Sequence, residues 1–378
     1  MKLRDQLYPH SNPKNKSTSY LTIACPSGTI SSRRFDMLFH PNLFFSRYLN
    51  WGGILFFTLT LCFVGCSDLD DERFNPKPVV IDNKEDSLGK VVVQLAPYYN
   101  NKKAAISITF DDGMKCHFDV AALALEARGF RGTFFVNGRN IFETRPTGGQ
   151  TITQSEARYM SECGHEISNH TFNHINVTKV SEDSLRKDLA KNDSLIELWT
   201  GKRPVTMAFP FNARNPATIQ VAKEGRVGVR TFEKGFGGAI NHSKLEDMVK
   251  WAETKIAKED WGVAMLHGIN EGYDGWDDAE PFFHFLDYLK SKEDELWVGI
   301  FRDVCAYREE VSIAQLHVIL VDGVLKGYAE CSLDVSLFNH PLTLVISVEG
   351  QESIIKDIMP NEKFEFDLKK QRILSMRF

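Results

Sequence analysis

The sequence predicts an α/β fold followed by a smaller β-domain, on three observations. Short apolar, β-branched segments end abruptly in polar residues, as buried strands do. The clearest is residues 106–110, which lead directly into Asp111 and Asp112. Segments with helical character separate these strands, and alternating short segments replace this pattern from about residue 313 onward.

The elements of the α/β part alternate along the chain. A strand that is apolar throughout is predicted to be buried. Gly164 indicates the end of one helix, and Ser181 indicates the start of the next. Polar residues that follow such strands form the site in α/β folds. We expect strands in 106–110, 132–136, 204–212, 227–231, 261–266 and 297–301, and helices in 118–127, 154–163, 182–199 and 283–289.

The first candidate site lies at the end of the strand 106–110. Asp111 and Asp112 precede Gly113, and an Asp-Gly turn with a helix cap is the structural alternative for these residues. About sixty residues later, His170 and His174 stand four apart, so on a helical turn both imidazoles would share one face. Two imidazoles and one carboxylate suit zinc or a similar divalent ion. Asp112 then supplies the carboxylate, which leaves Asp111 free to act as a base.

These two motifs, in this order, resemble those of a known family. Residues 109–113 read Thr-Phe-Asp-Asp-Gly and residues 170–174 read His-Thr-Phe-Asn-His. Across about residues 100–310 the chain is similar to the polysaccharide deacetylase (NodB-homology) family, which is carbohydrate esterase family four. The resemblance implies a distorted parallel (β/α) barrel that removes N- or O-acetyl groups from glycans with a bound divalent metal.

The resemblance also implies roles for individual residues. It assigns Asp112, His170 and His174 as metal ligands and Asp111 as the general base. Zinc is the expected metal, with cobalt, nickel and manganese as alternatives. His267 closes the predicted strand 261–266, where a lone histidine is more often structural. Its position in the series of motifs implies a general acid that protonates the departing amine or alcohol.

One position departs from the family pattern. An arginine followed by a proline and an aromatic residue is usual there, and this chain has Pro210 and Phe211 but Ala208 where the arginine would fall. Because the reaction develops an oxyanion, we expect the Phe211 backbone N–H to donate to it. Arg230 lies near the end of the following strand, and we expect it to supply the missing cation to Asp111. A surface arginine on a loop is the alternative.

The first hundred residues predict export rather than part of the barrel. An apolar run at 54–65 precedes Cys66, as in a bacterial lipoprotein signal, although Phe63 replaces the usual leucine. We therefore expect 37–66 to be a lipoprotein signal peptide and 1–36 a mis-assigned extension, with lipidated Cys66 anchoring the protein to a membrane of the cell envelope. A single anchor helix with a cytoplasmic tail is the alternative.

Two further segments complete the expected organisation. Residues 67–100, rich in Asp, Asn, Lys and Pro, are expected to form a linker with a short strand at 91–93. The barrel occupies 101–310. Residues 311–378 contain alternating segments and a hairpin-like Asp322-Gly323, which predict a small antiparallel β-domain of the sandwich kind.

Composition and motifs together define three candidate functions. The net charge of −5 and the absence of a basic cluster give no support for nucleic-acid binding. A metal-dependent N-deacetylase acting on an acetylated oligo- or polysaccharide is the first candidate. An O-acetyl esterase, for example on acetylated xylan, has the same machinery and is the second. The third is an inactive glycan-binding lipoprotein, which Ala208 would favour.

Overall fold

The computed structural model of the chain describes residues 76–83 and 88–370. The expected N-terminal extension, the signal peptide and Cys66 lie outside the described residues. Among the residues that it does describe, no helix is both long enough and apolar enough to cross a membrane.

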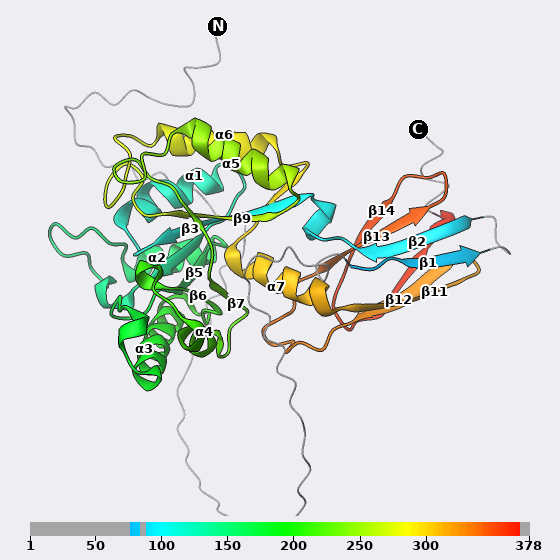
Figure 1. Cartoon of the computed structure of the whole chain (residues 1–378), viewed down its shortest axis with the longest axis horizontal. Helices are drawn as coiled ribbons and strands as arrows, with labels where there is room; N and C mark the ends of the chain where they lie inside the picture. Colours follow the sequence, from blue (N-terminus) through cyan, green and yellow to red (C-terminus); the bar gives the residue numbers. More distant parts are fainter. Residues whose placement is uncertain (1–75, 84–87, 371–378) are drawn as a thin grey trace, which may run out of the picture. The chain divides into compact units, whose positions relative to one another are not determined.

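A parallel half-barrel of strands with surrounding helices forms the larger part, as the sequence predicts (Figure 1). The strand order is β7-β6-β5-β4-β3-β9-β8. The short strand β10 pairs with the first residues of β3, on the same edge of β3 that pairs with β4 at its last residues. Every pairing in this sheet is parallel. The strands are β3 (Ala104–Asp111), β4 (Thr133–Val136), β5 (Glu166–Asn169), β6 (Thr206–Ala208), β7 (Gly228–Arg230), β8 (Lys234–Gly235), β9 (Trp261–Leu266) and β10 (Leu296–Val298).

The helices cover the sheet, and their ends follow local sequence signals. Ser181 accepts a hydrogen bond from the Ser184 N–H and begins α3, which confirms the predicted cap, and Gly201 ends that helix in a left-handed conformation. The helices are a π-helical turn (His117–Ala122) that continues into α1 (Leu123–Glu126), α2 (Gln154–Glu162), α3 (Glu182–Thr200), α4 (Pro216–Lys223), α5 (Leu245–Ala257), α6 (Glu280–Ser291) and α7 (Phe301–Ile313).

β3 lies inside this sheet, between β4 and β9, and is buried along its whole length. A strand covered on both faces reads as a continuous apolar run, which explains why residues 104–110 carry so few polar side chains. Phe110 stacks on Phe134 of the neighbouring strand, with 4.7 Å between ring centroids. Asp111 ends the strand where this apolar environment gives way to the site.

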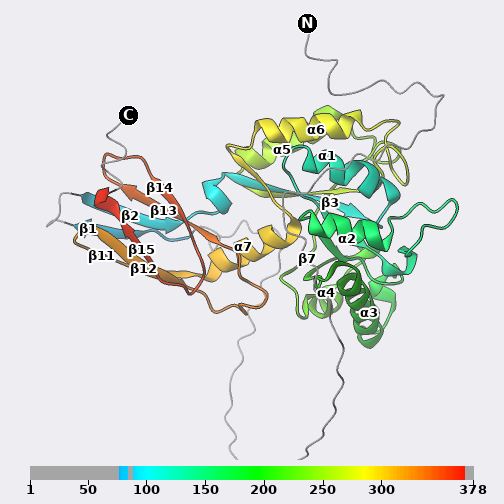
Figure 2. The ribbon, with the colours of Figure 1, turned by 180° about the vertical axis from the view of Figure 1, so that it is seen from behind.

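The β-domain consists of two antiparallel sheets, and the sequence analysis did not identify all of its strands. The segment 67–100 was expected to be a linker with one short strand at 91–93. That strand is part of a longer β2 (Gly89–Leu95), and β1 (Val79–Asn83) was not expected. The sheets are β1-β2-β13-β14 and β11-β12-β15 (Figure 2). Their other strands are β11 (Gln315–Val321), β12 (Val324–Glu330), β13 (Leu342–Val348), β14 (Ile354–Ile358) and β15 (Phe364–Asp367).

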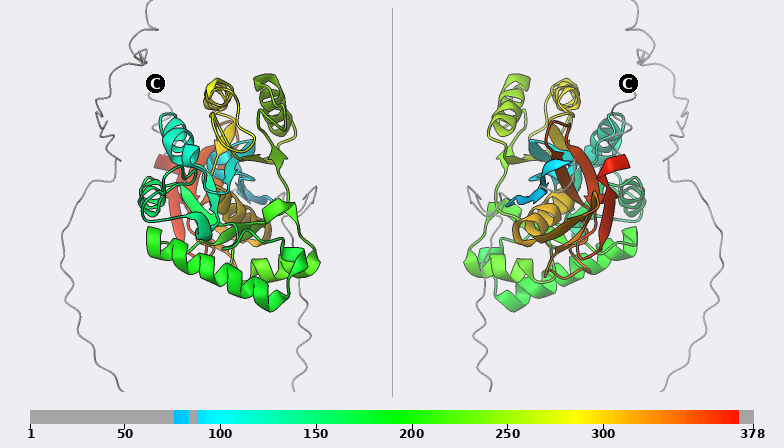
Figure 3. Two further views of the ribbon diagram at one scale, coloured as in Figure 1. Left: turned by 90° about the vertical axis from the view of Figure 1, so that its left-hand side faces the viewer. Right: turned by 90° about the vertical axis from the view of Figure 1, so that its right-hand side faces the viewer.

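The reason for this correction is long-range pairing. β2 alternates buried and partly exposed residues, and its Val91, Val93 and Leu95 need a core to enter. β13, some 250 residues later, supplies it by pairing Ile346 with Val93. Figure 3 shows the blue strands of the chain's first part beside the orange and red strands of its last part. The predicted Asp322-Gly323 hairpin is confirmed, with both residues at positive φ between β11 and β12.

Helix α7 contributes to the cores of both parts. Its Phe301 and Val304 pack with half-barrel residues, whereas Tyr307 and Val311 pack with the strands of the β-domain. The Tyr307 hydroxyl donates to the carbonyl of Ala96, which follows β2 (2.8 Å).

An acid lies buried in the same helix. Glu310 accepts one hydrogen bond, from the His340 N–H (3.2 Å), and its Oε1 has no hydrogen-bond partner among the described residues. Burial raises the pKa of Glu310 to about 8. The folded protein therefore keeps a proton on the Glu310 carboxyl group, which the unfolded chain releases at about pH 4. As a result, the free energy of unfolding should fall as the pH rises between these two values.

We predict that Glu310→Gln removes this pH dependence. The variant should be more stable than the parent protein by about 2 kcal/mol at pH 8.5, after allowance for partial solvent screening, and little different at pH 4.5. Urea unfolding at both pH values measures the effect. Glu162→Gln, at an exposed position of α2, is the control and should change neither value. An equal stability difference at the two pH values would contradict a buried, protonated Glu310.

Candidate active site

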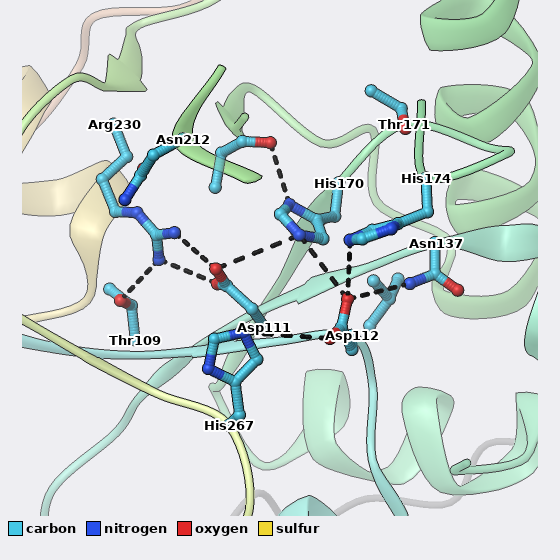
Figure 4. A network of polar contacts seen from close by, with 12 residues as sticks. Thr109, Asp111, Asp112, Asn137, His170, Thr171, His174, Asn212, Arg230 and His267 are labelled. Carbon is cyan, nitrogen blue, oxygen red and sulfur yellow. Dashed lines mark hydrogen bonds and ion pairs between the residues drawn. The ribbon is translucent and has the colours of Figure 1, made fainter. Parts of the chain in front are cut away.

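The side chains singled out by the sequence gather at the carboxyl ends of the parallel strands (Figure 4). Asp111 ends β3 and Arg230 ends β7, while His170 and His267 are the first residues after β5 and β9. Parallel strands point their carboxyl ends to one edge of a sheet, so residues far apart in sequence meet there. The strand-end prediction from the sequence therefore agrees with the positions of these residues.

Asp111 and Arg230 form a buried, two-pronged ion pair. The Arg230 Nη1 and Nη2 atoms donate to the two carboxylate oxygens of Asp111 at 2.8 and 2.5 Å, and Nη1 also donates to the Thr109 hydroxyl at 2.9 Å. Burial alone would raise the pKa of Asp111, but the Arg230 charge and hydrogen bonds, with nearby His170, hold it well below its usual range. The expected contact between Arg230 and Asp111 is present. Asp111 therefore has a cationic partner, although Ala208 stands where the family arginine would fall.

Asp112, His170 and His174 form a second cluster beside this pair. One nitrogen or oxygen atom from each lies within 4.8 Å of the others. The Asp112 Oδ1 atom is 3.1 Å from His174 Nε2 and 3.6 Å from His170 Nε2. Burial alone would raise the pKa of Asp112, but the hydrogen bond from His174 and the charge of His170 lower it on balance. These three are the residues that the sequence analysis expected to act together.

The two histidines do not lie on a helical turn, however. They belong to the loop after β5, in which Thr171 and His174 have positive φ angles of 59° and 53°. Positive φ is uncommon for residues other than glycine, and it turns the chain back so that His174 faces Asp112. The sequence spacing therefore gave the right partners for the wrong geometric reason.

The cluster has the chemistry that a divalent metal requires. The His170 Nδ1 atom lies 2.9 Å from the Ala208 carbonyl, which accepts its hydrogen and leaves the Nε2 lone pair directed at the cluster. Burial lowers the pKa of His170, which favours the neutral imidazole that metals bind. Two imidazole nitrogens and one carboxylate oxygen match a three-ligand catalytic zinc site. Asp112, His170 and His174 are thus the residues that could hold the ion.

His267 faces this cluster from β9. Its Nε2 atom is 3.8 Å from the Asp112 Oδ2 atom. The sequence analysis overlooked its support, the fully buried His117. The Met114 N–H donates to Nδ1 of His117, which leaves Nε2–H to donate to the His267 carbonyl at 2.8 Å. Burial lowers the pKa of His117 to about 4, so a neutral ring joins the turn after β3 to the end of β9.

Phe211 and Pro210 follow β6, and Phe211 lies beside His174. They form a short turn after β6 in which Phe211 has φ +60°, a conformation that aromatic residues rarely adopt. The Phe211 ring is exposed and contacts the His174 ring, with centroids 4.6 Å apart. Phe211 therefore reaches the site through its ring, and Pro210 precedes it in the same turn.

The sequence analysis also overlooked a set of buried polar residues on α3. Asp188 accepts from the Phe172 and Asn173 N–H groups (2.6 and 3.3 Å) and from the Asn173 side chain (2.6 Å). Asn192 links the ends of β4 and β5 by donating to Val136 O and Asn169 Oδ1. The sequence did carry a signal for Asp188 and Asn192, because both are polar residues at helical spacing among the apolar residues of this helix.

One more overlooked residue contacts the cluster directly. Asn137 follows β4 and donates from Nδ2 to the Asp112 Oδ1 atom at 3.3 Å. Its position immediately after a predicted strand was a usable signal, because each neighbouring strand also ends in a site residue. A hydrogen bond from an amide helps to fix the orientation of a carboxylate that is also to bind a metal.

Comparison with known proteins agrees with this geometry. Residues 98–229 match the family described as polysaccharide deacetylase. This part of the chain is a polysaccharide deacetylase domain. The matched segment includes β3 to β6, the first two residues of β7 and the cluster of Asp112, His170 and His174. Arg230, His267 and the β-domain strands β11–β15 lie beyond it.

Relatives of this deacetylase domain differ widely in length. A peptidoglycan-N-acetylglucosamine deacetylase of Bacillus cereus is 31% identical over 110 residues, which is 29% of this chain and 37% of that protein. A gellan lyase of a Bacillus species is 22% identical over 313 residues, 72% of this chain but only 12% of that protein. The chain thus spans between about an eighth and two fifths of these relatives' length.

Among solved structures, a family 4 acetyl xylan esterase from Clostridium thermocellum in complex with a cobalt ion is similar to this chain. It has 20% sequence identity and a TM-score of 0.40, and the match covers 53% of this chain and 89% of that one.

The anchoring of the histidine loop leads to a prediction for Asp188. Asp188→Asn exchanges an acceptor for a donor beside three N–H donors, so the loop of His170 and His174 should lose its fixed conformation. We expect zinc to bind 10- to 100-fold more weakly, as is typical when a residue that positions metal ligands is replaced. Competition with a chromophoric chelator measures this affinity. Asp183→Asn, on the exposed side of the same helix, is the control, and equal affinities in both variants would exclude this role.

Proposed function

We propose that this chain is a metal-dependent deacetylase that hydrolyses N-acetyl groups of a glycan. The observation that carries the proposal is the buried Arg230–Asp111 pair directly beside the cluster of Asp112, His170 and His174. A carboxylate that an arginine holds in place next to three side chains able to bind a metal is what hydrolysis by an activated water needs. Relatives named as peptidoglycan-N-acetylglucosamine deacetylases support the choice of an amide substrate.

Each residue has a part in the proposed reaction. Asp112, His170 and His174 would hold the metal, which when bound supplies a Lewis acid that polarises an acetyl carbonyl and acidifies a water. Asp111 accepts a proton from the attacking water, and its low pKa keeps it ionised and able to do so at neutral pH. Arg230 aims the Asp111 carboxylate by occupying both of its oxygens.

The remaining steps belong to residues on the two sides of the cluster. The Phe211 backbone N–H donates to the oxyanion that develops on the acetyl group. His267 donates a proton to the departing nitrogen of the sugar, and His117 holds its backbone in place. The same groups would hydrolyse an O-acetyl ester, and the likeness to a structure named as an acetyl xylan esterase keeps this the second candidate.

The inactive alternative has lost its main support. It rested on Ala208 in place of an arginine, and Arg230 makes the contact with Asp111 that this arginine was expected to make. Asp111, Asp112, His170, His174 and His267 are all present at one site.

Acetate release tests the proposed function directly. The purified chain should release acetate from at least one of acetylated chitin, peptidoglycan and xylan fragments, lose this activity with a chelator and regain it with zinc. His174→Ala should lose most of its bound metal because one of three ligands is gone. His317→Ala, which alters a histidine of the β-domain, is the control for both measurements. Chelator-resistant acetate release, or full metal content in His174→Ala, would count against the metal site.

A double-mutant cycle tests the shared role of Asp111 and Arg230. Asp111→Asn should lower kcat by on the order of a hundredfold or more, because a general base is lost, while zinc still binds. Arg230→Ala should also lower kcat but add little in the Asp111→Asn background, because both residues act on one step. Circular dichroism must accompany the kinetics, since Arg230→Ala leaves a buried carboxylate unpaired. Full activity of Arg230→Ala, or additive losses, would separate the two residues.

A further inference from the structure

Exposed aromatic side chains concentrate around this site. Among the described residues, only Phe142, Phe211 and Tyr273 are aromatic and strongly exposed, at 47%, 67% and 57%. Two of these three contact histidines of the site: Phe211 contacts His174, and Tyr273 contacts His267. Single exposed apolar residues need no explanation, but this placement does.

Tyr273 forms one wall of the site beside His267. The two ring centroids are 5.0 Å apart and the ring planes meet at 74°, so the rings form a corner. A corner with one aromatic wall and one hydrogen-bonding wall suits a molecule that has both an apolar face and hydroxyl groups. A pyranose ring is such a molecule, because its C–H groups form a face that packs on aromatic rings.

The loop that carries Tyr273 is firmly built. The Gly268 N–H donates to the Tyr273 carbonyl at 2.7 Å, which closes the loop just after His267. The next residue, Asp274, is buried at φ +58° and accepts from the Ile240 N–H (2.5 Å) and from the backbone and side chain of Asn241 (3.1 and 2.5 Å). These bonds tie the loop to residues 237–243. These hydrogen bonds hold the backbone of Tyr273 in place, so its side chain is exposed in a fixed loop.

The chemistry of the proposed reaction decides which part of the substrate meets Tyr273. His267 protonates the leaving atom, and that atom belongs to the sugar rather than to the acetyl group. The sugar must therefore lie within hydrogen-bond reach of His267, on the side where Tyr273 stands. The acetyl group, in contrast, must lie toward Asp111, Asp112 and the two metal-binding histidines.

We propose that Tyr273 is a specificity-determining residue that stacks on a sugar ring of a linear glycan at the site. This inference rests on the proposed deacetylase function and names the part of the substrate that the tyrosine recognises. A small aryl acetate has no sugar and does not need this wall. The binding of a glycan substrate should depend on Tyr273, and that of a small acetate ester should not.

The test compares two substrate sizes in Tyr273→Ala and Tyr273→Phe. With the pentamer of N-acetylglucosamine or acetylated xylopentaose, whichever is turned over, Tyr273→Ala should raise KM about tenfold and leave kcat within about threefold. With 4-nitrophenyl acetate, the kinetics should stay within about twofold of the parent protein. Tyr273→Phe keeps the ring and should behave like the parent protein with both substrates.

A matched control comes from the β-domain. Tyr328 also stacks on a histidine, His317, at 4.8 Å between ring centroids, but it lies on β12. Tyr328→Ala should leave both substrates unaffected. An unchanged pentamer KM in Tyr273→Ala, or an equal rise for pentamer and aryl acetate, would overturn the role of Tyr273. So would an equal effect of Tyr328→Ala.

Failure of the proposed function gives a different result. A parent protein that hydrolyses neither the aryl acetate nor any acetylated glycan in a metal-dependent manner would refute the deacetylase proposal. Calorimetric titration with the two pentamers then tests Tyr273 without turnover. Weaker binding to Tyr273→Ala than to Tyr273→Phe would support a sugar-stacking role, and equal binding, or none to the parent protein, would refute it.

Discussion

The site depends on a buried charge that must be neutralised. Asp111 lies at the end of a fully buried strand, where a single carboxylate would be strongly destabilised. Arg230 neutralises it with two parallel hydrogen bonds and is itself buried. In the sheet order, β7 and β3 are separated by β6, β5 and β4. In a flat sheet these strands would lie about 19 Å apart, so the pair requires the curvature of the half-barrel.

That curvature also arranges the other groups. The carboxyl ends of β3, β5 and β9 bring Asp112, His170 and His267 around one space. The histidine loop is not a regular element, and its conformation comes from outside it: Asp188 of α3 accepts from its backbone, and the Ala208 carbonyl orients the His170 ring. Helix α3 therefore serves the site as well as the core, because its buried face carries hydrogen-bonding groups where an amphipathic helix usually carries only apolar ones.

The β-domain is tied into the chain by pairing between distant segments. β2 directly precedes the half-barrel in sequence, yet it pairs with β13, and Tyr307 of α7 bonds to the residue that follows β2. The half-barrel is thus enclosed in sequence by segments of the β-domain. The gellan lyase relative matches 72% of this chain, against 29% for the peptidoglycan deacetylase of Bacillus cereus.

The sequence by itself determined the fold class, the positions of most strands of the half-barrel and the residue types that gather at the site. The runs that end in Asp111-Asp112 and His267 could be read locally, because strand burial and strand-end polarity are short-range patterns, whereas β5 before His170 was not predicted. Arg230 was also within reach, since the expected arginine is missing at Ala208 and a charge was required. The predicted carboxylate and imidazole partners lie together in the structure.

Only the tertiary structure decided how these residues are held. The sequence placed His170 and His174 on a helical turn, whereas hydrogen bonds from α3 and left-handed residues create their loop. It placed residues 79–95 in a linker with one short strand, because a strand whose partner lies 250 residues away leaves no local sign of that partner. The hydrogen-bond partners of Asn137, His117 and Asp188 could not be predicted for the same reason, although the positions of Asn137 and Asp188 carried a local signal. A hydrogen-bonding side chain acquires its role from the group opposite it, and the fold alone sets that distance.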